Sequence, residues 1–180
     1  MKDYYAEKQM IARVDKKGNV MGKIEKWKAH RLGILHRGFT VTVCYQDYLI
    51  IQHRKHPAFD ATFDATISSH QLFINGSLQD TIDATYDALK RELNIEKSDL
   101  ISKPKKIGFV YYKAKDPKSE FTEHEVDDVL IVEVEKIPTP NFDFAYGVSL
   151  VKRNELSNTK SRIYTNLAPW VKVMIKENML

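Results

Sequence analysis

The chain has little cysteine, glycine and proline, and it has no long apolar run. Cys44 is the single cysteine among 180 residues, so no disulfide can form within the chain. Disorder is not expected, since 43% of the residues are hydrophobic and there are only 7 glycines and 6 prolines. No apolar run approaches the ~20 residues that a membrane helix needs. We therefore expect a soluble cytoplasmic protein without a membrane partner.

Length and sequence organisation favour one compact unit. A chain of 180 residues can bury a core without disulfides or a structural metal. No repeat, low-complexity segment or long linker divides it, and residues 1–15 carry charges at both ends without the apolar core of a signal peptide. We expect a single domain spanning residues 1–180.

The basic character of the chain does not indicate nucleic-acid binding. The formal net charge is +4, but the 28 basic residues are spread from Lys2 to Lys176. The densest cluster, KPKK at 103–106, has no interleaved aromatic residues on which bases could stack. A small phosphorylated substrate would match the same charge, so we expect no nucleic-acid partner.

Hydrophobic periodicity predicts a mixture of strands and helices. Strands are expected at residues 10–14, in a hairpin over 39–51 that turns at Gln46 and Asp47, at 61–67, at 106–114 and at 126–134. Helices are expected at 80–93 with Asn94 as C-cap, at 152–157 as a short turn, and at 167–177. Residues 20–37 have the character of a polar connection. The pattern is a mixed α and β class without a βαβ repeat.

Histidines and glutamates are the residues most suited to chemistry. In an extended strand, Glu123 and Glu125 share a face while the residue between them points away. An isolated pair of this kind is most often solvated, and a lone histidine is seldom a ligand. Together with His30, His36 and His70, however, the two carboxylates would form a mixed nitrogen and oxygen site suited to manganese or zinc. Spacing alone does not show that these segments converge.

Several motifs, taken in order, resemble the Nudix superfamily and, within it, the metal-dependent (type I) isopentenyl diphosphate delta-isomerases. The segments are EKWKAHRLGILHRGF, SSH, LKRELNI, EHEV and LAPWVKVM. The similarity extends from about residue 14 to about residue 174. It implies the Nudix fold, an α/β/α sandwich with a mixed sheet.

The resemblance also implies metal and substrate ligands. The five metal ligands would be His30, His36, His70, Glu123 and Glu125, holding Mn²⁺ or Zn²⁺. Glu92 would match the glutamate that holds Mg²⁺ bound through the substrate diphosphate, an ion that keeps waters and bridges phosphate oxygens. Lys26 and Arg54 would bind the diphosphate, as a point charge and by forked hydrogen bonds respectively.

The reaction of the resembled isomerases moves a double bond by adding one proton and removing another. Glu125 and Tyr112 match the pair that delivers the proton, and Trp170 matches the tryptophan whose ring stabilises a cation between the two steps. Without the other motifs, core packing would be the better interpretation of Tyr112 and Trp170. Ser68 stands where the resembled isomerases have a catalytic cysteine. A thiol with a pKa near ~8.5 exchanges protons around neutrality, whereas a serine hydroxyl needs an activating base.

Other positions also depart from the pattern. The helix of the Nudix box, DALKRE, retains one glutamate, Glu92. Upstream of this helix, Gln79 replaces another glutamate of the box. Ala88 replaces a further diphosphate-binding arginine, and Lys55 cannot be aligned because the following segment is shorter. Fewer carboxylates argue against an ordinary Nudix hydrolase, whose chemistry clusters carboxylates around water-activating ions. Loss of the cysteine argues against an efficient isomerase.

Three functions follow as hypotheses. The first is an isomerase of isopentenyl and dimethylallyl diphosphate, the second a Nudix hydrolase that cleaves a diphosphate-containing metabolite, and the third a non-catalytic diphosphate binder. The histidines and the glutamate pair favour the first. We expect a small-molecule diphosphate as partner, and the sequence is compatible with a monomer or a homodimer.

Overall fold

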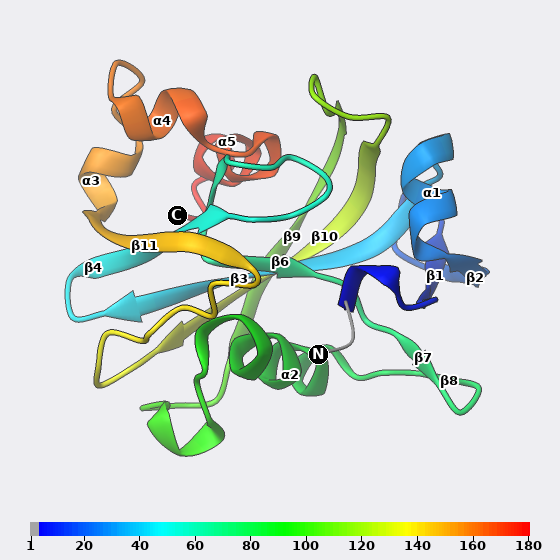
Figure 1. Ribbon diagram of the computed structural model, residues 1–180, viewed down its shortest axis with the longest axis horizontal. Helices are drawn as coiled ribbons and strands as arrows, with labels where there is room; N and C mark the ends of the chain where they lie inside the picture. Colours follow the sequence, from blue (N-terminus) through cyan, green and yellow to red (C-terminus); the bar gives the residue numbers. More distant parts are fainter. Residues whose placement is uncertain (1–3) are drawn as a thin grey trace.

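The computed structural model describes residues 4–180, which contain two sheets and several helices (Figure 1). The strands are β1 (Met10–Val14), β2 (Val20–Glu25), β3 (His36–Tyr45), β4 (Tyr48–Arg54), β5 (Phe63–Asp64), β6 (Ile67–Ser69), β7 (Phe73–Ile74), β8 (Ser77–Leu78), β9 (Lys105–Lys115), β10 (Thr122–Glu133) and β11 (Ala145–Lys152). The helices are α1 (Lys26–Leu32), α2 (Thr81–Leu93), α3 (Arg153–Leu156), α4 (Arg162–Asn166) and α5 (Pro169–Lys176), with 3-10 turns η1 (Tyr4–Ala6) and η2 (Lys97–Asp99).

A mixed sheet forms the centre of the protein, with α2 on one face and α5 on the other (Figure 1). Its main path runs β11-β4-β3-β1-β2, while β10 pairs with β3 and with β9. The ladder of β3 with β10 is parallel, and the other ladders between the described strands of this sheet are antiparallel. The expected α/β/α sandwich with a mixed sheet is therefore confirmed.

Two cores lie on opposite faces of this sheet because side chains alternate along each strand. On one face, Val41 and Leu130 pack with Leu89 of α2. On the other face, Val129 packs in the core that contains Trp170 and buried residues of α5. Val129 and Leu130 are neighbours in β10, so one strand supplies both cores. Each fully buried side chain of this size contributes about 2 kcal/mol of transfer free energy.

The central helix has the boundaries that its sequence predicts. The Asp80 carboxylate accepts hydrogen bonds from the amides of Ile82 and Asp83, which satisfies donors at the start of α2. Asn94 ends the helix in the left-handed conformation, with a φ of 54°. The predicted helix, including its C-cap, is confirmed.

The prediction of a polar connection over residues 20–37 is wrong, because this segment contains β2, α1 and the start of β3. Strand β2 is mostly exposed, so its sequence shows no apolar alternation. The buried residues of α1 include Lys26 and His30, so a pattern of apolar residues could not reveal the helix. Gly33 ends α1 with a φ of 59°, a conformation that glycine adopts readily.

Other boundaries also differ from the prediction. Strand β10 begins at Thr122, earlier than expected, so Glu123 and Glu125 lie within it rather than before it. The expected strand at 61–67 is divided between β5 and β6. Strand β11 and helix α4 were not predicted. Among the described residues, no helix is both long and apolar enough to cross a membrane.

Candidate active site

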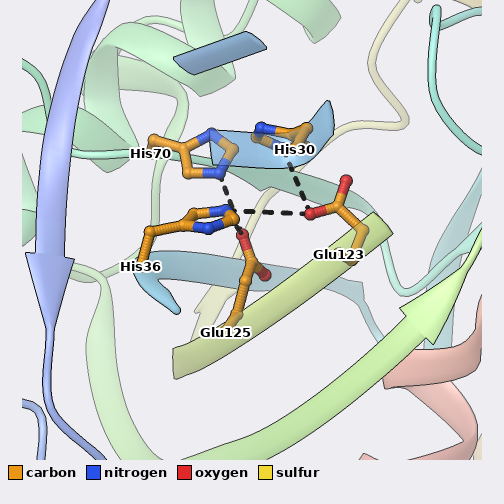
Figure 2. Close-up of side chains that lie close together, drawn as sticks. All are labelled: His30, His36, His70, Glu123 and Glu125. Atoms are coloured by element: carbon orange, nitrogen blue, oxygen red, sulfur yellow. Dashed lines mark hydrogen bonds and ion pairs between the residues drawn. The ribbon is translucent and has the colours of Figure 1, made fainter. Parts of the chain in front are cut away.

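Five side chains from four segments of the chain converge (Figure 2): one comes from α1, one from β3, one from just after β6 and two from β10. Each offers a nitrogen or oxygen atom, and these atoms all lie within 4.8 Å of one another. The residues are His30, His36, His70, Glu123 and Glu125. The structure thus brings together all five residues that the sequence suggested as ligands of one ion.

Strand pairing places the two glutamates beside a histidine. In the parallel ladder of β3 and β10, Glu125 lies opposite His36. Alternation along β10 puts Glu123 on the same face as Glu125. His124 is directed elsewhere, because its Nδ1 lies 2.9 Å from the carbonyl oxygen of Gly33.

Backbone carbonyls fix the protonation of two imidazoles. His30 Nδ1 lies 2.6 Å from the carbonyl oxygen of Lys26, and His36 Nδ1 lies 2.7 Å from that of Ile34. A carbonyl only accepts, so each Nδ1 carries the donated proton. In the neutral ring, Nε2 then has a free lone pair that is directed toward the carboxylates, an arrangement typical of metal-binding histidines.

The contacts inside the cluster fit a bound cation. His30 Nε2 lies 3.2 Å from Glu123 Oε2, and His36 Nε2 lies 3.2 Å from Glu125 Oε1. Three atoms of the cluster are buried and have no hydrogen-bond partner: His30 Nε2, His36 Nε2 and Glu123 Oε2. Imidazole lone pairs that face carboxylate oxygens repel each other unless a proton or a metal ion lies between them. Three imidazoles and two carboxylates are a donor set suited to manganese or zinc.

His70 and Gly38 complete the environment of Glu125. His70 Nε2 lies 2.9 Å from Glu125 Oε1. Burial lowers the pKa of His70 to about 4, which keeps its ring in the neutral form that binds metal ions. A Cβ atom at Gly38 would lie 2.6 Å from Glu125 Oε1, so this close approach requires a glycine.

A pocket opens over the cluster. Of the residues that the sequence suggested, it is lined by Lys26, Arg54, Ser68, His70, Glu92, Tyr112, Glu123, Glu125 and Trp170. His30 and His36 lie behind this lining and are fully buried. Residues of the lining that the sequence did not suggest are Tyr4, Tyr5, His56, Ser69 and Arg91. Arg91 adjoins Glu92 in LKRELNI, which was a usable signal; the tyrosines at the start of the chain gave none.

Glu125 connects the cluster to Tyr112. Its Oε1 faces His36 and His70, whereas its Oε2 accepts a hydrogen bond from the Tyr112 hydroxyl. Burial, and then the Glu125 charge, raise the pKa of Tyr112 well above its ordinary value. The phenol therefore keeps its proton at neutral pH.

Three cations line the pocket; Lys26 and Arg54 are buried and Arg91 is half-buried. Lys26 is 4% exposed, and burial, followed by Arg91, lowers its pKa to about 8. Arg54 Nη1 lies 2.6 Å from Asp64 Oδ2. Arg91 Nη2 lies 2.6 Å from Glu92 Oε1. This set of charges suits an anionic ligand.

Glu92 lies in the pocket but outside the five-residue cluster. Besides Arg91, its carboxylate accepts a hydrogen bond from Gln52 Nε2 at 3.2 Å. The position is compatible with the predicted role in holding Mg²⁺ through a ligand, which remains a prediction. Cys44 packs in the core on the α5 side and is absent from the pocket lining, so it does not replace the missing cysteine.

Replacement of His70 by alanine should abolish tight binding of one transition-metal ion per chain. The remaining ligands would lose an imidazole, so metal affinity should fall by more than the 10–100-fold that loss of an outer hydrogen-bond partner costs. Metal content after dialysis, measured by plasma mass spectrometry, checks this. His124→Ala, on the same strand but directed away, is the control and should retain the ion. An unchanged metal content in folded His70→Ala would refute the site.

The lowered pKa of Lys26 should make anion binding depend on pH. Free protein must take up a proton at Lys26 above about pH 8, so affinity for inorganic diphosphate should fall by up to about tenfold per pH unit there. Lys26→Arg should remove this decline because guanidinium stays charged. Calorimetric titration between about pH 6.5 and pH 9.5 measures it. Lys28→Arg, an exposed position on the same helix, should keep the wild-type profile. Identical profiles for wild type and Lys26→Arg would contradict the assignment.

Sequence comparison gives one informative relative. No family model matches the chain. The chain is 26% identical over 182 residues to a Cannabis sativa protein, "Isopentenyl-diphosphate Delta-isomerase 1, chloroplastic". The match covers 90% of this chain and 63% of the relative, so the chain spans less than two thirds of that protein.

Structural comparison shows the fold. A protein from Deinococcus radiodurans superposes with a TM-score of 0.70 at 16% identity, covering 93% of this chain and 98% of the other. A MutT Nudix hydrolase from Burkholderia pseudomallei gives 0.57 at 12% identity, covering 79% and 96%. A bifunctional NMN adenylyltransferase/ADP ribose pyrophosphatase from Francisella tularensis gives 0.52 at 14% identity, covering 78% and 40%. The chain thus has a Nudix fold and resembles isopentenyl diphosphate isomerase.

Proposed function

We propose that the protein is a divalent-metal-dependent Nudix enzyme that interconverts isopentenyl and dimethylallyl diphosphate by an allylic proton shift. The observation that carries this proposal is the double engagement of Glu125. One of its oxygens belongs to the cluster of three histidines and two glutamates, and the other accepts a hydrogen bond from the Tyr112 hydroxyl. A plant isomerase as sequence relative supports the same reaction.

The pocket offers a binding surface for each part of this substrate. Lys26 and Arg54 supply positive charge for the diphosphate, and Glu92 would share Mg²⁺ with it. A metal ion in the cluster would hold both glutamates and set the acidity of Glu125. Trp170 lines the pocket, and its ring lies 5.8 Å from that of Tyr112. Its aromatic face would stabilise positive charge on the C5 unit.

Two places in the pocket would serve the proton shift. Glu125 and Tyr112 hold the proton that would be added to one carbon, and burial keeps them out of bulk water. Ser68 would lie at the carbon that loses a proton. Its Oγ lies 3.0 Å from Asp64 Oδ1, so this hydroxyl has a carboxylate partner.

A Nudix hydrolase that cleaves a diphosphate-containing metabolite is the second candidate. It is favoured by the fold, which a MutT Nudix hydrolase shares. Helix α2, however, contributes only Glu92 as a carboxylate to the pocket, and Ala88 is buried in the core. Water activation between clustered ions would need more carboxylates from this helix. A binder without catalysis is the third candidate, and no observation favours it.

Incubation with isopentenyl diphosphate in heavy water, followed by proton and phosphorus NMR, tests the proposal. The protein would be supplied with Mg²⁺ and trace Mn²⁺. We expect dimethylallyl diphosphate with deuterium in a methyl group, because the added proton comes from exchangeable groups. Release of phosphate without deuterium uptake would establish hydrolysis instead, and an unchanged spectrum would reject both activities on this substrate.

Ser68→Cys should raise the rate of isomerisation. A thiol has a pKa near ~8.5 and exchanges protons near neutrality far more readily than a hydroxyl, so we expect at least a tenfold higher kcat. The same deuterium assay measures it. Ser69→Cys, at the adjacent pocket position, controls for the mere presence of a thiol. An unchanged or lower kcat in Ser68→Cys would show that Ser68 is not a weakened substitute for cysteine.

A further inference from the structure

Asp64 is a buried carboxylate that holds three residues of the pocket without lining the pocket itself. Its Oδ2 accepts a hydrogen bond from Arg54 Nη1 at 2.6 Å. Its Oδ1 accepts from Trp170 Nε1 at 2.9 Å and from Ser68 Oγ at 3.0 Å. Asp64 is 0% exposed and is not part of the pocket lining, whereas all three partners are. It therefore acts on a ligand only through these partners.

The hydrogen bonds around Ser68 fix the direction of its hydroxyl. Ser68 Oγ lies 2.8 Å from Thr40 Oγ1 as well as 3.0 Å from Asp64 Oδ1. Either hydroxyl could donate in the Ser68–Thr40 contact, whereas a carboxylate oxygen only accepts, so Ser68 donates its proton to Asp64 Oδ1. The partner that takes the Ser68 hydrogen bond is therefore buried in the interior. The Ser68 proton is held away from the pocket, and an oxygen lone pair remains for a ligand.

The same carboxylate fixes a cation against an aromatic ring. The Arg54 guanidinium carbon lies 5.1 Å from the centre of the Trp170 ring. Both side chains bond to Asp64, one at each oxygen. A buried, doubly anchored arrangement of this kind restricts the rotamers of Arg54 and Trp170 before any ligand arrives.

We propose that Asp64 is the positioning residue of the pocket, which sets the hydroxyl direction of Ser68, the plane of Trp170 and the orientation of Arg54 together. This inference rests on the proposed function, in which Arg54 binds the diphosphate, Trp170 faces the C5 unit and Ser68 lies at the carbon that loses a proton. Asp64 links the anion-binding part of the pocket to the part where the proton shift would occur. Replacement of Asp64 should therefore affect both the binding of the diphosphate and the rate of the proton shift.

The affinity for inorganic diphosphate distinguishes a role of Asp64 in orienting Arg54 from the mere effect of its negative charge. Asp64→Asn removes a negative charge near the pocket, so electrostatics alone would tighten the binding of an anion. Loss of Arg54 orientation would instead weaken it. We expect the Kd for inorganic diphosphate with Mg²⁺ to rise at least about tenfold in Asp64→Asn. An equal or lower Kd would overturn the proposal.

Asp116→Asn is the matched control. Asp116 is also buried, at 2% exposure, and accepts from the amides of Phe59 and Lys118 and from the Ser119 hydroxyl. None of these partners lines the pocket. Diphosphate affinity in Asp116→Asn should equal that of the wild type, and a loss equal to that of Asp64→Asn would overturn the specific role.

The indole N–H of Trp170 gives a second readout that does not require a ligand. In a nitrogen-proton NMR spectrum, its resonance is assigned by its loss in Trp170→Phe. Asp64→Asn should shift this resonance and speed its exchange with water by at least about tenfold, because a charge-assisted hydrogen bond is lost. An unchanged indole resonance would overturn the proposal.

A paired variant keeps the test valid if Asp64→Asn does not fold. A lone buried Arg54 is costly, whereas removal of both charges is better tolerated. In Arg54→Gln alone the indole N–H should keep its slow exchange with water, because Asp64 still accepts from it, and adding Asp64→Asn should speed that exchange. Equal exchange rates in these two variants would refute the role of Asp64. Failure of the wild type to bind diphosphate or to convert isopentenyl diphosphate would refute the proposed function instead, since the indole readout does not depend on either.

Discussion

The candidate site depends on the parallel pairing of β3 with β10, which makes both strands begin at the same edge of the sheet. This ladder sets Glu125 opposite His36, and the alternation along β10 adds Glu123 on the same face. A shift of register by one residue would turn both carboxylates to the other face of the sheet. Parallel strands need a long crossover, and here α2 and β9 lie between them in the chain. The same crossover therefore supplies Glu92 from α2 and Tyr112 from β9.

Burial of so many charged groups would be costly if each stood alone, and their partners explain how the fold tolerates it. Arg54 is neutralised by Asp64, and Arg91 by Glu92. His30 and His36 are held by hydrogen bonds to backbone carbonyls, so the lone pairs of their Nε2 atoms are directed before a ligand binds. Three buried polar atoms without a hydrogen-bond partner, His30 Nε2, His36 Nε2 and Glu123 Oε2, lie together in the five-residue cluster. Their convergence at one point is what a preorganised ion site requires.

Sequence reasoning found the cluster because imidazoles and paired carboxylates leave a chemical signature, and because the motifs occur in the order of a known fold. It did not find α1, although His30 lies on it, since the buried residues of that helix include Lys26. It assigned Glu123 and Glu125 to one face correctly but placed the start of their strand too late. Asp64 gave no signal at all, because a single aspartate in a short strand acquires a role only through its hydrogen bonds to Arg54 and Trp170, and neither residue is its neighbour in sequence.

The same geometry bears on the choice between isomerase and hydrolase. A hydrolase needs carboxylates that hold ions around an attacking water, yet α2 directs Ala88 into the core and offers Glu92 alone. An isomerase needs a group that holds a proton and a group that accepts one. The Tyr112 hydroxyl donates a hydrogen bond to Glu125 at a buried position, while Ser68, whose own proton is directed to Asp64, keeps an oxygen lone pair. This asymmetry between a proton-bearing pair and an accepting hydroxyl matches the needs of an allylic proton shift, and it favours the isomerase.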